Sequence, residues 1–152
     1  MVEPTFNMPP EGQLWPHTWL VAGDLIISLT QEGPIPDETW DRFVADVERT
    51  TTKRMLGIGI GTIHVNSPQR RTLANAMHDK RVAAVLGSSV ARGVATALGW
   101  MGLKIRTFSW KDIGNAFEYL GSPDSTTQEA VELVREMLVR AGAPPLDELS
   151  GE

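Results

Sequence analysis

The sequence predicts an α/β fold in which a mixed sheet begins with an antiparallel strand pair and continues with parallel strands. Two short apolar runs flank Gly23-Asp24, a pair typical of a tight hairpin turn. Beyond residue 36, stretches with helical periodicity alternate with apolar stretches of strand length. Such alternation is typical of parallel strands joined by right-handed helical crossovers. We therefore expect about five strands in one sheet.

The first half of the domain is expected to hold a hairpin, a helix and a strand. The hairpin spans residues 17–31, and the glycine-aspartate pair supplies the positive backbone angles of its turn. A helix is expected over residues 36–50, with Asp37 as its cap. Its apolar residues recur at the spacing of one helical face: Trp40, Phe43, Val44 and Val47. Residues 55–65 follow as a strand in which glycines alternate with isoleucines.

The next elements continue the alternation. Ser67 and Pro68 are expected at the cap and first-turn positions of a helix that runs to about Lys80. Residues 81–87 predict a short buried strand of the kind found in parallel sheets. Residues 88–102 predict a helix with few charges and many small side chains, which should pack closely on the sheet.

Residues 103–109 predict a further strand, and residues 110–120 an amphipathic helix. A last helix is expected from about Asp124 to Ala141, where Gly142 and two prolines end it. These elements divide the chain into a flexible leader (1–14), one folded domain (15–121), a C-terminal helix (122–142) and a flexible tail (143–152).

The composition excludes several classes of protein. The chain has no cysteine, so disulfides, thiolate metal sites and cysteine nucleophiles are excluded, and a reducing compartment is favoured. The N-terminal stretch is acidic and interrupted by prolines, which is unlike a signal peptide. No apolar run approaches the roughly 20 residues that span a bilayer. We therefore expect a cytoplasmic protein without a transmembrane segment.

The net charge of -5 is unevenly distributed. Residues 53–111 hold ten Lys and Arg against one acid, whereas residues 1–52 and 112–152 each hold nine acids and two bases. A basic segment is typical of binding to nucleic acid, phospholipid or another anion. It also arises where acidic and basic helices neutralise each other within a fold. Because the bases are spread over several elements and not gathered in a tail, we expect no DNA partner.

The motifs of common enzymes are missing. A dinucleotide fingerprint needs GxGxxG with its last glycine at a helix start, but in GIGIGT the third glycine, Gly61, comes one position early. The histidines His17, His64 and His78 each stand alone in their segments, and no nucleophile elbow is present. We therefore expect a protein that is not an enzyme, with no catalytic residues, no metal site and no cofactor.

Ser67 is the residue most suited to a switch. It opens a helix and precedes Gln69, Arg70 and Arg71. A phosphate there would lie at the positive end of the helix dipole beside two arginines. The alternative is an ordinary capping serine that contributes about 1 kcal/mol of stability.

Ser88 and Ser89 occupy the next strand-to-helix turn, and Arg92 follows one turn later. Turns beyond the carboxyl ends of parallel strands share one edge of the sheet, where ligands usually bind. The candidate contacts to a partner or an anion at this edge are Asn66, Gln69, Arg70, Arg71, Ser88, Ser89 and Arg92.

The order of elements over roughly residues 15–121 resembles that of STAS domains of the anti-sigma-factor antagonist type. It is similar in particular to bacterial stand-alone proteins described as STAS-like or CRAL-TRIO-related. In those proteins a segment similar to SPQRRTLANAM precedes one similar to SSVARGVATALGWMGLKIRTFS. The most specific residues of the resemblance are Val90, Arg92, Gly93, Thr96, Ala97, Leu98, Trp100, Lys104 and Phe108.

The resemblance implies a mixed sheet with helices packed mainly on one face and a role in protein binding. In antagonist members a partner kinase phosphorylates a serine at the start of the helix after the third strand, and the phosphate blocks partner binding. Ser67 is the corresponding position. The family motif Asp-Ser-(Ser/Thr)-Gly reads Asn66-Ser67-Pro68-Gln69 here, so its acid and its glycine are missing.

We therefore expect a non-enzymatic regulatory module that docks another protein, either a kinase or a signalling partner, and is switched at Ser67. The alternative is a module that binds an anion, a lipid headgroup or a nucleotide through the basic central segment. The last helix lies outside the resemblance, and its apolar stripe must be covered by the domain or by a second copy. A homodimer is thus a further expectation.

Overall fold

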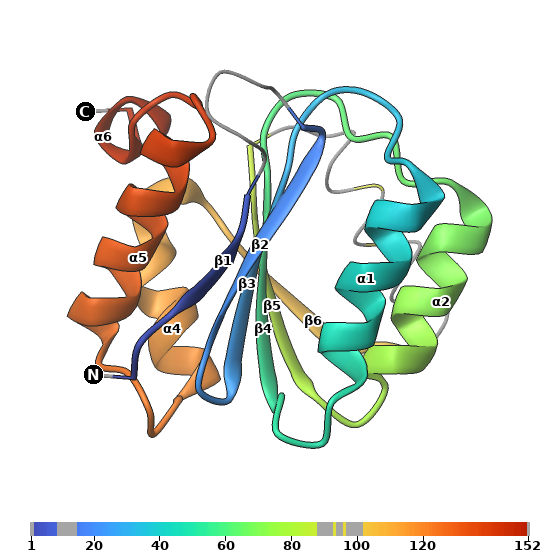
Figure 1. The fold of residues 1–152 in the computed structure, drawn as a ribbon. Coiled ribbons are helices and arrows are strands. Elements are labelled where there is room, and N and C mark those ends of the chain that lie inside the picture. Colours follow the sequence, from blue (N-terminus) through green and yellow to red (C-terminus); the bar gives the residue numbers. More distant parts are fainter. Residues whose placement is uncertain (1, 9–14, 88–92, 94–95, 97–101, 152) are drawn as a thin grey trace.

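The computed structural model describes residues 2–8, 15–87, 93, 96 and 102–151. It shows an α/β fold in which a six-stranded mixed sheet, in the order β1-β2-β3-β4-β5-β6, stands between two layers of helices (Figure 1). The predicted fold class is confirmed, with antiparallel strands at the N-terminus and parallel strands after them. The sheet has one strand more than expected.

The additional strand lies in residues 1–14, which were expected to be a flexible leader. β1 (Thr5–Asn7) pairs antiparallel with β2 (His17–Ala22) and places Phe6 opposite Leu20. Phe6 packs against the buried core. The leader prediction is wrong for these residues, because a strand of three residues is too short to show an alternating pattern.

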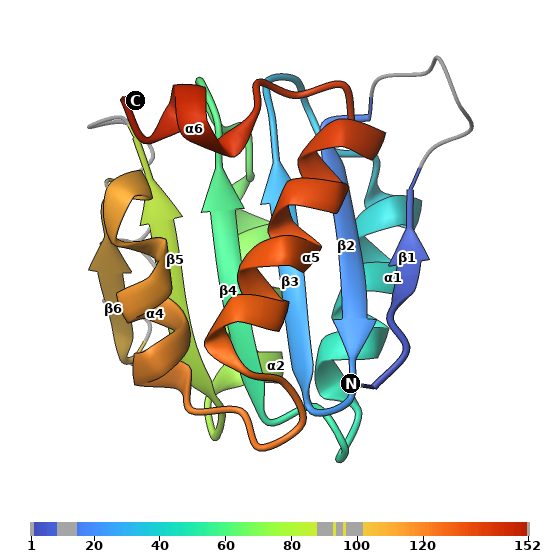
Figure 2. The same ribbon diagram turned by 90° about the vertical axis from the view of Figure 1, so that its left-hand side faces the viewer.

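The predicted hairpin is confirmed, and the strands after it are parallel. β2 is joined to β3 (Leu25–Thr30) through Gly23 and Asp24. Only Gly23 has a positive φ, 58°, so the prediction that both residues supply positive angles is wrong for Asp24. The remaining strands are β4 (Arg54–Gly59), β5 (Arg81–Leu86) and β6 (Ile105–Phe108). Each pairs in parallel with the strand before it, so the carboxyl ends of β3, β4 and β5 lie together at the top of Figure 2.

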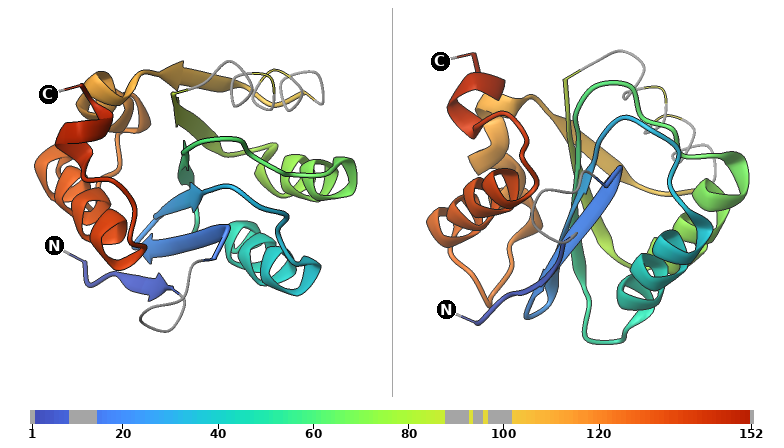
Figure 3. Two further views of the ribbon diagram at one scale, coloured as in Figure 1. Left: turned by 90° about the horizontal axis from the view of Figure 1, so that it is seen from above. Right: turned by 45° about the horizontal axis from the view of Figure 1, so that its top comes forward.

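Helices cover both faces of the sheet (Figure 3). α1 (Asp37–Glu48) and α2 (Ser67–Met77) pack on one face, and most of the helix predicted over 88–102 lies outside the described residues. A short 3-10 turn (Trp110–Asp112) and α4 (Ile113–Leu120) return the chain to the other face. The resemblance implied helices mainly on one face of the sheet. The described helices instead lie on both faces.

The C-terminal helix is confirmed as α5 (Thr127–Arg140), which lies beside α4 (Figure 2). Residues 143–152, expected to be a flexible tail, contain the short helix α6 (Leu146–Leu149), whose Leu146 is buried. That part of the prediction is wrong, since four residues with two leucines, Leu146 and Leu149, are too short a stretch to establish helical periodicity. None of the helices in the described ranges is long and apolar enough to cross a membrane.

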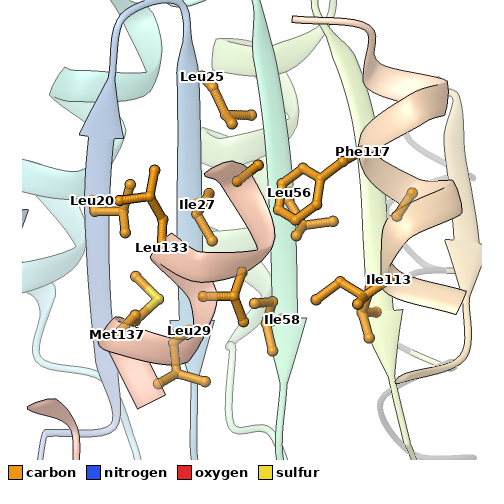
Figure 4. Close-up of a cluster of buried hydrophobic side chains, with 14 of the residues drawn as sticks. Leu20, Leu25, Ile27, Leu29, Leu56, Ile58, Ile113, Phe117, Leu133 and Met137 are labelled. Atoms are coloured by element: carbon orange, nitrogen blue, oxygen red, sulfur yellow. The ribbon is translucent and has the colours of Figure 1, made fainter. Parts of the chain in front are cut away.

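The core between the sheet and the helices α4 and α5 is shown in Figure 4. Leu133 and Met137 of α5 point toward Leu20 and Ile27 of the sheet, and Phe117 of α4 points toward Leu56. Burying one such side chain contributes about 1.5–3 kcal/mol, which exceeds what helix propensity alone provides. The apolar stripe of α5 is thus covered by the domain itself and gives no support to a homodimer.

Candidate functional site

The turn from β4 to α2 carries Ser67, the predicted switch. Ser67 is exposed and is the first helical residue, while the N-cap is Asn66. Asn66 Oδ1 accepts a hydrogen bond from the backbone N–H of Gln69 (2.9 Å), and Gln69 Oε1 accepts one from the backbone N–H of Asn66 (3.2 Å). This arrangement is a capping box. The prediction of Ser67 as the cap is wrong, because Asn66 supplies the capping oxygen one residue earlier.

Gln69 is 3% exposed and ties the start of α2 to the start of α1. Its Nε2 donates to the carbonyl of Ile35 (2.8 Å) and to Asp37 Oδ1 (3.2 Å). In return, Trp40 Nε1 donates to the carbonyl of Gln69 (3.0 Å). Asp37 is the first residue of α1, and Pro36 is its N-cap. The prediction of Asp37 as the cap is wrong. Gln69 was expected to contact a partner or an anion. Because its side chain is buried, it supports the surface around Ser67 and does not form part of it.

Arg70 links Ser67 to the loop before α2. Its Nη2 donates to Ser67 Oγ (2.8 Å), and its Nη1 donates to the carbonyl of Val65. Its Nε is buried without a hydrogen-bond partner. The guanidinium is thus held beside the exposed hydroxyl, and the exposed Arg71 follows it in the chain.

Ser88, Ser89 and Arg92, which were expected to share this edge, lie outside the described residues. The last residue of β5, Leu86, pairs in register with Gly59, the last residue of β4. The two strands therefore end level, at the same edge of the sheet.

Three cations of the basic segment lie at the opposite edge, where β4 and β5 begin. Lys80 Nζ donates to two backbone carbonyls just after α1, at 3.0 and 2.6 Å, and burial lowers its pKa. Arg54 Nε and Arg81 Nη1 donate to the last two carbonyls of α4, at 2.6 and 3.1 Å. Such terminal carbonyls lack partners within their own helices and carry the negative end of the helix dipole.

Arg54 also forms an ion pair with Asp24, and the hydroxyl of Ser122 donates to the other oxygen of that carboxylate. Arg70 and Arg71 therefore lie at the carboxyl edge of the sheet, whereas Arg54, Lys80 and Arg81 lie at the amino edge and bind backbone carbonyls or an acid of the same chain. For Arg54, Lys80 and Arg81 the arrangement agrees with internal neutralisation.

A second feature of the fold was not singled out in the sequence. A cavity of about 80 Å³ lies between the sheet and the helices α1 and α2. Its described lining is mainly apolar, and its polar members are His17, Ser28 and Thr30.

His17 is the polar residue of this cavity whose hydrogen bonding is incomplete. It is 1% exposed, with Nδ1 3.0 Å from Thr30 Oγ1 and with Nε2 lacking a hydrogen-bond partner. Burial lowers the pKa of His17 to about 3, so the ring is neutral at pH 7. A buried polar atom without a partner costs about 1–3 kcal/mol. The described residues leave Nε2 unpaired, on a side chain that lines the cavity.

Among the described residues, no group of three or more His, Asp or Glu side chains is arranged to hold a metal ion. Comparisons with protein-family models, with curated proteins and with solved structures find no match for this chain. The resemblance to STAS domains therefore stays a prediction.

Proposed function

We propose that the chain is a non-enzymatic regulatory module of STAS-like type, which docks a partner protein on the surface around Ser67 and is switched by phosphorylation of that serine. The observation that carries the proposal is the hydrogen bond from Arg70 Nη2 to the exposed Ser67 Oγ, 2.8 Å long, in the first turn of α2. This bond places a cation where an added phosphate would need one.

A phosphate on Ser67 would add about -1.5 to -2 charges at pH 7. The unmodified surface carries the positive charges of Arg70 and the exposed Arg71. Phosphorylation would cancel them, so the partner that fits presents acidic groups here and would lose affinity. The helix start need not move, because Gln69 and Trp40 hold it against α1.

The test is affinity capture from a lysate of the native cells, with quantitative mass spectrometry of bait and captured proteins. Wild type, Ser67→Asp and Thr127→Asp serve as baits. Thr127 is the matched control, since it follows the capping residue of α5 as Ser67 follows that of α2, on the other face of the sheet. We expect a partner that wild type and Thr127→Asp capture equally and Ser67→Asp captures about tenfold less, a loss of about 1.4 kcal/mol.

Phosphate on Ser67 in protein purified from native cells is the second expected result. Because an acid near a helix N-terminus stabilises it by about 0.3–1 kcal/mol, Ser67→Asp should not lower the melting temperature. Equal capture by Ser67→Asp and wild type would contradict the switch. Capture of no partner by any bait would contradict docking.

A further inference from the structure

The cavity between the sheet and the helices α1 and α2, called the sheet cavity below, results from small residues at one level of three neighbouring strands. Ser28 of β3 pairs in register with Gly57 of β4, and Gly57 pairs with Ala84 of β5. All three line the cavity. The next level toward the strand starts holds large core residues: Ile26, Met55 and Val82.

Gly57 is not required by packing or by the backbone. A methyl group at this position would lie 3.6 Å from Met55 Cε and 3.7 Å from Ser28 Oγ, which are ordinary contact distances. The φ of Gly57 is not positive, so other residues could adopt its conformation. Because glycine has no side chain, Gly57 leaves part of the cavity unfilled.

His17 gives the sheet cavity a polar end. Its ring is held by Phe43 and Trp40, with ring centroids 4.4 and 5.2 Å away. Since Nδ1 is paired with the hydroxyl of Thr30, Nε2 is the nitrogen left for a ligand. The Thr30 hydroxyl can donate or accept, so Nε2 is an acceptor in one tautomer and a donor in the other.

We propose that the sheet cavity binds a small neutral molecule with an apolar body and one hydroxyl group, such as a short alcohol. Its apolar part would lie against Gly57 and Ala84, and its hydroxyl would pair with His17 Nε2. A hydroxyl group donates and accepts, so it fits either tautomer of the ring. The described lining carries no charged side chain, which disfavours an ion.

The size of the sheet cavity limits the ligand. Its volume, about 80 Å³, is roughly half that of the ~150 Å³ engineered cavity that holds benzene. A chain of about three or four carbons is therefore the longest that it accommodates in full.

The test is a titration of the full chain with 1-propanol, 1-butanol and 1-pentanol, followed by NMR of the methyl groups of Ala84 and Met55. We expect saturable shifts of the Ala84 methyl. From 1-propanol to 1-butanol the affinity should rise about fourfold, the value for one buried methylene, and the gain should then level off. Val139→Ala, on the exposed side of α5, is the control that should leave the titration unchanged.

Two variants distinguish the contribution of the apolar lining to ligand binding from that of His17. Gly57→Ala places a methyl group in the cavity and should weaken 1-butanol binding about tenfold, with the fold retained. His17→Phe keeps a ring and removes Nε2, so it should weaken 1-butanol binding about fivefold and leave the binding of n-pentane unchanged.

Shifts that do not saturate, or that are equal in Gly57→Ala and wild type, would overturn the proposal and leave Nε2 to an internal water. An equal loss of n-pentane and 1-butanol in His17→Phe would overturn the pairing with Nε2.

Discussion

Gly57 and Gly59 lie two residues apart on the same face of β4, yet only Gly59 is closely packed. A methyl group at Gly59 would collide with Ile63 Cδ1 and lie 2.8 Å from Leu86 Cδ2. At Gly57 the nearest atom would be 3.6 Å away. The alternation of glycine and isoleucine therefore has two causes within one strand: close packing at its end and the sheet cavity at its centre.

The two glycines should respond to alanine in opposite ways. Gly57→Ala should raise the free energy of unfolding by about 0.5–1 kcal/mol, because alanine loses less backbone entropy and meets no collision. Gly59→Ala should lower it by up to about 1 kcal/mol, because the ends of the Ile63 and Leu86 side chains must turn aside. Urea unfolding of both variants measures the difference. Destabilisation by Gly57→Ala equal to that by Gly59→Ala would show that the space beside Gly57 is not available.

The elements could be predicted where a pattern extends over several turns or strand residues. The stripe of Trp40, Phe43, Val44 and Val47 identifies α1, and all four residues are buried. β1 and α6 could not be predicted in this way, because they have only three and four residues, with one apolar side chain in β1 and two in α6.

The N-cap of α2 could be predicted only from a longer motif. Asn66 and Ser67 are both favoured capping residues, so residue type alone does not choose between them. The spacing of Asn66 and Gln69 is that of a capping box, and this signal identifies the cap.

The sheet cavity could not be predicted from the sequence, because its residues meet only through strand register. His17 lies opposite Thr30, and Ser28 lies beside Gly57, 29 positions further along the chain. A register shift of one residue would turn each of these side chains to the other face of the sheet. None of these residues belongs to a recognisable sequence motif, and the cavity forms only where the paired strands bring them together.

The bonds of Gln69 predict an unusual response to Gln69→Glu. Glutamate is a common residue at this position of a capping box and would still accept from the Asn66 N–H. The variant loses the donor to the Ile35 carbonyl and places a carboxylate against Asp37. We expect the free energy of unfolding at pH 7 to fall by about 2–3 kcal/mol, with partial recovery at acid pH as the new carboxyl is protonated. Urea unfolding at several pH values measures both effects.

The reverse exchange in the capping box of α5 is the matched control. Glu129 is bonded by the backbone N–H and the side chain of Thr126, and these bonds hold its pKa below the ordinary 4.5. A depressed carboxyl pKa stabilises the fold above that ordinary value, and the effect is lost as pH falls through the folded value. Glu129→Gln should therefore cost stability at pH 7 and nothing at low pH. A similar cost for both exchanges at pH 7 would contradict a special role of Gln69.

The buried neutral ring of His17 should make the protein sensitive to acid. Burial lowers the pKa of His17 from 6.5 to about 3, so unfolding below pH 6.5 exposes a ring that takes up a proton. The unfolded state then binds more protons than the folded one, and the free energy of unfolding falls as pH falls, by up to about 1.4 kcal/mol per pH unit. His17→Phe keeps a ring and removes this proton uptake. Between pH 7 and about pH 4.5, the variant should gain about 2–3 kcal/mol relative to wild type in urea unfolding. A difference that stays constant with pH would show that His17 is not held neutral in the fold.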